Sequence, residues 1–473
     1  MDKEFNLDKE FEIKGYWWIP GNENKKIFGI LNYSVIKGIY LTLYEYLQKE
    51  SKINYKIDLI YGETLDNKDN KKISIHNCIL IGIYENTIKV IIKGLELFIG
   101  DLHVPNNFYA NKIEVNYTLL DSWLGRENPY NIQTTLKKDK KELIKFKLEY
   151  QPPKDIFYKF NFDNLKLNLG FIFSFTTNQK IYGSFASKEK SLAVFSTEQN
   201  VDYKNYFLKY INIFQSFLTF AIDNLVIPTK IHIFLPNNSE LEYYRIFVKE
   251  IPSDEYKLQE TMLLPYKNIK NKFVDIFEKW FEIYNILELG FLNSLYYSSL
   301  NPIYIFITII PKLEIFFINY YPDESLIIEK NNFKELKGNI IKLIEKFYLD
   351  KNLNFKNDKN LWSNKIDLLN NISLRRILKK IITENENILY TLKIFNSRDE
   401  IDNFINDVCN SRNYYIHLLK DYKDKAKKGG ELYDLTLKLH LTLIILILKS
   451  LRFNQDEIVI YVKRILYRFN SSL

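Results

Sequence analysis

The sequence predicts an α+β chain in which an antiparallel β-rich half, of sandwich or barrel type, precedes an all-α helical bundle. From about residue 25 to 235 the apolar residues recur with a period close to two, and after about residue 268 the period changes to 3.6. The 473 residues are 46% hydrophobic, which is enough for more than one core. We therefore expect two domains, at residues 1–255 and 256–473.

The strands of the first half are predicted from short apolar runs rich in β-branched and aromatic residues, separated by polar turn segments. The runs are Ile27–Leu31, Ile39–Leu43, Ile57–Tyr61, Cys78–Tyr84, Ile88–Ile92, Lys112–Leu119, Leu143–Tyr150, Phe171–Phe175 and Ile231–Leu235. Helical spacing of apolar residues over 206–222 predicts one helix among these strands. This pattern is typical of an antiparallel sandwich or barrel.

The second half shows amphipathic segments joined by short polar connections, which predict a helical bundle. The segments are Phe273–Leu287, Ile303–Tyr321, Leu336–Tyr348, Ile372–Ile382, Asp399–Asp421, Leu432–Leu451 and Gln455–Phe469. Prolines and mixed charge between Pro252 and Pro265 interrupt both patterns and mark the domain boundary.

Composition excludes several classes of protein. Two cysteines, Cys78 and Cys409, provide neither a disulfide framework nor a zinc cluster, and no glycine-rich loop predicts a nucleotide cofactor. No compact cluster of acidic, histidine and cysteine residues predicts a metal site. A charged N-terminus and the lysines within the most apolar helical stretch favour a cytoplasmic protein with no membrane partner. The net charge of +8 permits a nucleic-acid partner without requiring one.

His417 has the most informative setting of the five histidines. It closes the segment Ser411–His417, in which Asn413 follows Arg412 directly and His417 comes five residues after the arginine. The other four, His76, His103, His232 and His440, lie in predicted strands, a loop and a helix, where a structural role is the more frequent one. We also expect the paired tryptophans Trp17–Trp18 to serve burial.

The Arg412–Asn413–x3–His417 segment in a helical half resembles the HEPN ribonuclease signature. The motifs Gly15–Pro20, Ile60–Gly62 and Leu119–Trp123 look like the β-rich N-terminal domain of ApeA-like anti-phage defence proteins. In that family the β-rich domain precedes a C-terminal HEPN domain, so the resemblance spans almost the whole chain in the same order.

The resemblance implies an abortive-infection endoribonuclease that needs no metal and cleaves RNA, with tRNA as the expected substrate. Arg412, His417 and Asn413 are then the catalytic candidates, and no cofactor is expected. Arg412 suits the charge of the phosphorane, His417 can transfer protons near neutral pH, and Asn413 could orient the imidazole or the substrate.

The same resemblance implies a homodimer or higher oligomer through the helical domain, and a phage-derived activator acting on the β-rich domain. Five residues on an ideal helix turn through about 140°, so Arg412 and His417 would not share one helix face. A two-fold dimer would bring two arginines and two histidines into one cleft. Glu314, on an earlier helix, is a candidate for a supporting role.

Two alternatives remain open at this point. The helical half could be a non-catalytic HEPN module that binds RNA or a nucleotide, with a β domain that recruits a partner. The chain could also be a β-sandwich carbohydrate-binding or hydrolytic protein with a helical dimerisation domain. The intact Arg412 and His417 disfavour the first alternative, and the absence of a persuasive carboxylate pair in the β half disfavours the second.

Overall fold

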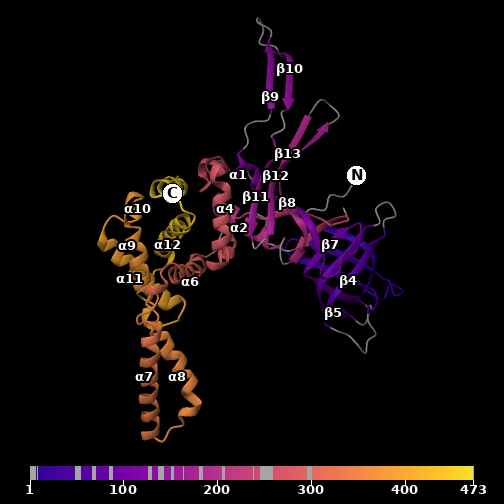
Figure 1. Cartoon of the computed structure of the whole chain (residues 1–473). Helices are drawn as coiled ribbons and strands as arrows, with labels where there is room; N and C mark the ends of the chain where they lie inside the picture. Colours follow the sequence, from indigo (N-terminus) through magenta and orange to yellow (C-terminus); the bar gives the residue numbers. More distant parts are fainter. Residues whose placement is uncertain are drawn as a thin grey trace. The chain divides into compact units, whose positions relative to one another are not determined.

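The chain forms two compact units, residues 1–278 and 279–473, in a computed structural model (Figure 1). The structure describes all residues except 1–6, 8, 48–54, 66–70, 85–88, 126–129, 137–142, 151–153, 163–164, 180–184, 205–207, 238, 246–258, 296–300 and 472–473. The domain boundary expected at 255/256 therefore lies outside the described residues.

The first unit is β-rich, as predicted. Its strands are β1 (Phe11–Trp18), β2 (Ile27–Ser34), β3 (Gly38–Leu43), β4 (Lys56–Thr64), β5 (Lys72–Tyr84), β6 (Lys89–Gly94), β7 (Glu96–Gly100), β8 (Tyr109–Tyr117), β9 (Tyr130–Leu136), β10 (Leu143–Tyr150), β11 (Ile156–Phe162), β12 (Leu165–Gln179), β13 (Phe185–Asp202), β14 (Pro228–Phe234) and β15 (Glu240–Arg245). Each of the nine predicted runs overlaps one of these strands. The helices are α1 (Leu120–Leu124), α2 (Leu208–Ile222) and α3 (Tyr266–Ile269), with short 3-10 turns at Gln259–Thr261 and Lys270–Lys272.

Six strands close into a barrel in the order β1-β2-β3-β6-β5-β4, because β5 pairs with both β4 and β6. The first part of the long strand β5 also pairs with β7, which continues the sheet outward through β15, β14, β8, β13, β12 and β11. Among the described residues, the strand pairings within this sheet are all antiparallel. The barrel form of the prediction is therefore confirmed, with extra strands beyond the closed ring.

Trp17 fills the barrel interior and is fully buried. Glycine on the neighbouring strand makes room for its ring, because a Cβ at Gly62 would lie 2.3 Å from Trp17. Trp18 is also buried, with 4% of its surface exposed. The expected burial role of this pair is confirmed.

Helix α2 covers the outer sheet with an aromatic core. Twelve of its fifteen residues are buried, and Phe214 contacts rings of β8, β12 and β13. Trp123, from the α1 turn, is fully buried beside Phe214 and donates its indole N–H to the carbonyl of Leu264 at 2.8 Å. This core holds the segment around Leu264, just before α3, against the β-rich unit.

His76 lies inside the β-rich unit with none of its surface exposed. Its Nε2 is 3.1 Å from the carbonyl oxygen of Val104, and its Nδ1 has no hydrogen-bond partner in the described part of the chain. Burial lowers the pKa of His76 to about 4, which the Val104 contact and the charge of Glu96 only partly oppose. The ring is therefore neutral in the folded protein at physiological pH.

We expect the β-rich unit to lose stability as the pH falls from about 6.5 to about 4. In that window an unfolded His76 binds a proton that the folded one does not, so acid favours unfolding by at most ~3 kcal/mol. Above pH 6.5 this contribution is constant. Thermal unfolding at pH 7 and pH 5 should show a smaller pH-dependent change in Tm for His76→Gln than for the wild type. Equal pH dependence in His76→Gln and wild type would refute this assignment.

The second unit is helical, as predicted. Its helices are α4 (Phe273–Ile286), which begins in the first unit, α5 (Leu292–Leu295), α6 (Pro302–Tyr320), α7 (Lys330–Asp350), α8 (Phe355–Leu369), α9 (Leu374–Glu384), α10 (Glu386–Thr391), α11 (Arg398–Tyr415), α12 (Gly429–Ser450) and α13 (Gln455–Ser471). Short 3-10 turns lie at Leu289–Phe291, Pro322–Glu324 and Lys420–Tyr422.

Helices α6 and α12 pack together at the centre of this unit. Thirteen of the 22 residues of α12 are buried, so it is the core helix. By length and composition alone α6 could cross a membrane, although a core helix has the same two properties. α6 also contacts α9 and α11, and its Glu314 lies against Arg412 on the last turn of α11.

Candidate active site

Helix α11 carries the predicted arginine on its last turn. Its N-terminus is capped by Ser397, whose side chain accepts a hydrogen bond from the backbone N–H of Glu400. The buried residues Ile401, Phe404 and Val408 hold one face of the helix in the core. Arg412 is favourably placed, because a positive charge near a helix C-terminus opposes the negative end of the helix dipole.

The chain leaves the helix before it reaches His417. α11 ends at Tyr415, and Leu418 adopts a left-handed conformation with φ of 55°. The backbone N–H of Leu419 then donates to the carbonyl of Asn413 at 3.1 Å. The predicted extension of this helix to Asp421 is therefore wrong, and an ideal-helix angle between Arg412 and His417 does not apply.

His417 lies in the turn after α11 and is exposed. Its imidazole forms no hydrogen bond or ion pair with any residue that the structure describes. Asn413 is half-buried, and among the same residues its side-chain amide has no hydrogen-bond partner. Both side chains are therefore available to a ligand.

The loop after His417 folds back on α11. The hydroxyl of Tyr415 donates to the carbonyl of Lys427 at 2.9 Å, and the backbone N–H of Lys427 donates to Oγ of Ser411 at 3.0 Å. Lys423 and Lys425 are exposed on this loop, in the lysine-rich run that follows His417. Two hydrogen bonds to the last turns of α11 thus hold a basic loop close to the candidate site.

Glu314 joins the site from α6. Its Oε1 lies 3.1 Å from Nη2 of Arg412, and each of the two side chains is 27% exposed. The Nε atom of Arg412 is buried and has no hydrogen-bond partner in the described part of the chain. The pair therefore fixes one side of the guanidinium group and leaves further donor capacity on the other.

Burial and neighbouring charges act in opposite directions on the pKa of Glu314. Burial raises the pKa of Glu314, and the charges of Arg412 and His417 partly oppose that rise. The structure thus places Arg412 against Glu314, and His417 in the turn that follows the same helix.

The sequence indicates only a supporting role for Glu314. The structure shows that its ion-pair partner is Arg412. The signal in the sequence is a single carboxylate among apolar residues of α6, where Leu313, Phe316 and Phe317 are buried. A carboxylate that is removed from water needs a positive charge or hydrogen-bond donors beside it. The sequence alone does not show that the compensating charge is Arg412.

The remaining histidines have partners typical of structural residues. Nε2 of His103 lies 2.8 Å from the carbonyl oxygen of Gly62, and its ring stacks on Tyr61 with a centroid separation of 4.4 Å. His232 lies on β14, where burial lowers its pKa to about 4, and His440 is half-buried on α12. Within the described residues, no group of three or more His, Cys, Asp or Glu side chains could hold a metal ion.

The family models match both halves of the chain in order. The model of ApeA N-terminal domain 1 matches residues 12–280, which is more than half of the chain. The chain belongs to the ApeA family. A model of the Apea-like HEPN domain matches residues 307–457, a range that contains Glu314, Arg412, Asn413 and His417. The predicted resemblance is therefore confirmed, including the order of the two domains.

The ApeA assignment fits a role in anti-phage defence with a HEPN nuclease domain. HEPN domains are generally ribonucleases, and they typically bind RNA and dimerise. Searches of curated proteins and of solved structures found no match to this ApeA-like chain.

Proposed function

We propose that this ApeA-like chain is an abortive-infection endoribonuclease of the cytoplasm, which cleaves RNA without a metal ion and takes tRNA as its substrate. The observation that carries the proposal is the ion pair of Arg412 with Glu314, followed by an exposed His417 just after the same helix, within the range that the HEPN model matches. An imidazole can transfer protons and a guanidinium group can stabilise negative charge on a phosphoryl group, and RNA cleavage uses both functions.

The proposed reaction begins with loss of the proton from a ribose 2′-hydroxyl, followed by attack of that oxygen on the adjacent phosphorus. The bond from phosphorus to the 5′-oxygen breaks, and the leaving oxygen takes up a proton. The products are a 2′,3′-cyclic phosphate and a 5′-hydroxyl. The neutral His417 imidazole of one subunit takes the 2′-hydroxyl proton, the protonated His417 imidazole of the second subunit gives a proton to the 5′-oxygen, and Arg412 donates hydrogen bonds to the phosphoryl oxygens as their negative charge grows.

Glu314 acts in this proposal as a positioning residue. Its contact with Nη2 of Arg412 holds one edge of the guanidinium plane, so the remaining donors keep a fixed direction. Asn413 follows Arg412 directly and offers an amide to the substrate or to the imidazole. The exposed lysines of the loop after His417 attract the RNA backbone.

The β-rich unit serves, in this proposal, as the sensing and regulatory domain, and a phage-derived activator is its ligand. The support is the ApeA N-terminal match over residues 12–280. The buried state of Trp17 and Trp18 means that these two side chains are core residues of that unit and not a preformed contact surface.

We expect RNA cleavage by the purified protein to survive an excess of EDTA and to leave 2′,3′-cyclic phosphate ends. Histidine and arginine can together carry the internal attack of the 2′-hydroxyl, so the reaction needs no metal-bound nucleophile. Cleavage of labelled RNA with and without EDTA, followed by analysis of the end groups, checks this. Strict dependence on magnesium or manganese, with 5′-phosphate products, would reject the mechanism.

We also expect the active species to be a dimer whose two sites face one another. A single His417 per chain is poorly suited to serve as both base and acid, whereas a two-fold axis near α11 would supply a second imidazole. Mixing His417→Ala chains with wild type should lower activity further than simple dilution does. Activity that tracks the wild-type fraction linearly, or an active monomer in solution mass measurements, would contradict the composite site.

A further inference from the structure

The hairpin of α7 and α8 exposes an unusual amount of apolar surface. Figure 1 shows these two helices extending away from the rest of the helical unit. None of the 21 residues of α7 is buried. Leu343, Phe347 and Leu349 are 68%, 56% and 68% exposed, and Leu353 in the connecting turn is 53% exposed. Single exposed apolar residues are common, but a contiguous group of them marks an interaction surface.

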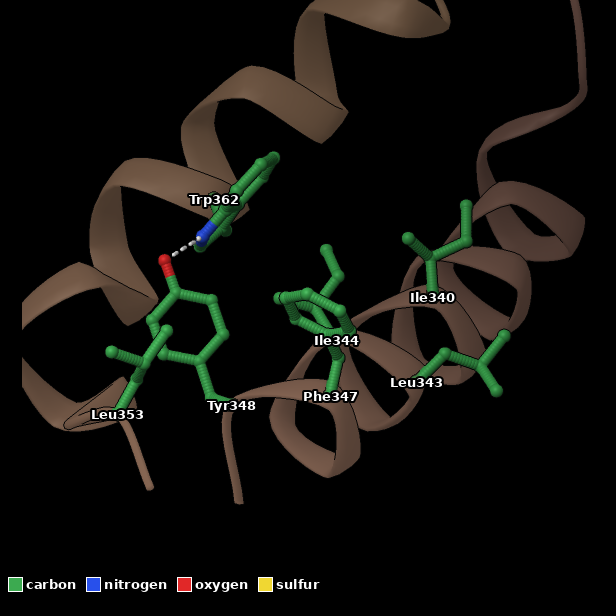
Figure 2. A pocket seen from close by; sticks show the side chains of 7 residues that line it. All are labelled: Ile340, Leu343, Ile344, Phe347, Tyr348, Leu353 and Trp362. Atoms are coloured by element: carbon green, nitrogen blue, oxygen red, sulfur yellow. Dashed lines mark hydrogen bonds between the residues drawn. The ribbon is translucent and has the colours of Figure 1, made fainter. Parts of the chain in front are cut away.

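A groove of about 390 Å³ lies between the two helices (Figure 2). Of its seven lining residues, only Tyr348 and Trp362 carry a polar side-chain atom. The indole N–H of Trp362 donates to the Tyr348 hydroxyl at 3.0 Å, and that hydroxyl donates to Oδ2 of Asp358 at 3.0 Å. The polar atoms of the groove are thus already paired with each other, so its surface favours apolar groups over hydrogen-bonding ones.

The exposed apolar residues do not all face the groove. Leu343 and Leu349 are six residues apart, which places them about 120° apart around an ideal helix. A single docked helix covers an apolar stripe of about 100°. A fluid apolar phase, unlike a single docked helix, can contact both Leu343 and Leu349.

The positive charge of the hairpin favours an anionic partner. Residues 330–369 contain nine lysines and five acidic residues, so these 40 residues carry +4 of the chain's net +8. Eight of the lysines are exposed, and within the described residues only Lys337 forms an ion pair, with Asp367 at 2.6 Å. A second copy of the hairpin would bring like charges together, whereas an anionic surface would complement them.

We propose that the α7–α8 hairpin is a docking surface for an anionic lipid bilayer. Leu343, Phe347 and their neighbours enter the boundary between headgroups and acyl chains, and the lysines reach lipid phosphates with their long side chains. This proposal departs from the expectation of no membrane partner, and it stands independently of RNA cleavage.

Sedimentation of the full-length protein with vesicles tests the proposal. The vesicles contain equal parts of phosphatidylglycerol and phosphatidylcholine, or phosphatidylcholine alone. We expect the wild type to bind the anionic vesicles and to be released by salt. Leu343→Gln/Phe347→Gln should bind at least about tenfold more weakly, and replacement of Lys342 or Lys346 by glutamine should weaken binding about fivefold for each lysine.

Ile460→Gln is the matched control, because Ile460 is a 54% exposed apolar residue of α13, away from the hairpin sequence. It should bind as the wild type does. Wild-type protein that stays in the supernatant would overturn the proposal, as would equal binding by Leu343→Gln/Phe347→Gln, which would mean that the lysines act alone. A fall in the solution mass of that variant without any lipid binding by the wild type would assign the surface to a second copy.

Discussion

Replacement of His417 by alanine is expected to lower the rate of RNA cleavage by about 100- to 10,000-fold, the usual loss for a positioned acid-base group. The fold should be unaffected. His417 is exposed and lies outside α11, and its ring has no hydrogen-bond or ion-pair partner among the described residues. Substitutions at such positions usually change the free energy of unfolding by less than about 0.5 kcal/mol.

His440→Gln provides the matched control, because it removes the other histidine of the helical half. It lies on α12, and cleavage should proceed at the wild-type rate. Single-turnover rates on labelled RNA, together with the Tm of each variant, separate chemistry from folding. Cleavage by His417→Ala at the wild-type rate would show that the active site lies elsewhere.

Replacement of Arg412 by alanine should cost about 100- to 1,000-fold in cleavage rate, which is typical for a donor that stabilises transition-state charge. It also leaves Glu314 without its ion-pair partner. The stability cost should be small, because both side chains of this ion pair are 27% exposed and water can solvate the carboxylate. Arg412→Lys should recover only part of the activity, since it keeps the charge but loses the planar set of donors.

The double variant Arg412→Ala/Glu314→Gln tests whether the loss comes from an unpaired carboxylate. This variant removes both charges of the pair, so any electrostatic damage caused by Glu314 alone disappears. We expect its cleavage rate to stay as low as that of Arg412→Ala. Recovery to the wild-type rate would mean that Arg412 only neutralises Glu314 and does not contact the phosphate.

The sequence predicts the fold class well because both periodicities are strong, and its errors have local physical causes. Strand β7 was not predicted, because all five of its residues are buried and no alternation is visible. Strand β1 was missed because a glycine interrupts its inward-facing apolar residues. That glycine, Gly15, is required, since a Cβ there would lie 2.4 Å from the carbonyl oxygen of Glu63.

Two errors in the helical half also have local physical causes. Helix α8 was missed because polar residues dominate its first two turns, although Phe355 and Ile366 are buried. The end of α11 was placed too late because neither glycine nor proline marks it, and Leu418 adopts the left-handed conformation that usually favours glycine. This turn determines the exposure of His417.

The candidate site was predictable as a motif but not as a geometry. The spacing of Arg412 and His417 and the family resemblance predict the candidate residues. The pairing of Arg412 with Glu314 depends on a long-range contact between α6 and α11, and no local pattern encodes it. Their roles in catalysis stay predictions until cleavage is measured.

Sequencing of RNA ends in cells that express either the wild type or His417→Ala, with and without phage, tests the central proposal most directly. The proposal predicts new 5′-hydroxyl and 2′,3′-cyclic phosphate ends, concentrated in tRNA, in infected wild-type cells and their absence in infected His417→Ala cells. The same new ends in both strains, or no new ends in protected wild-type cells, would contradict RNA cleavage by the Arg412–His417 site.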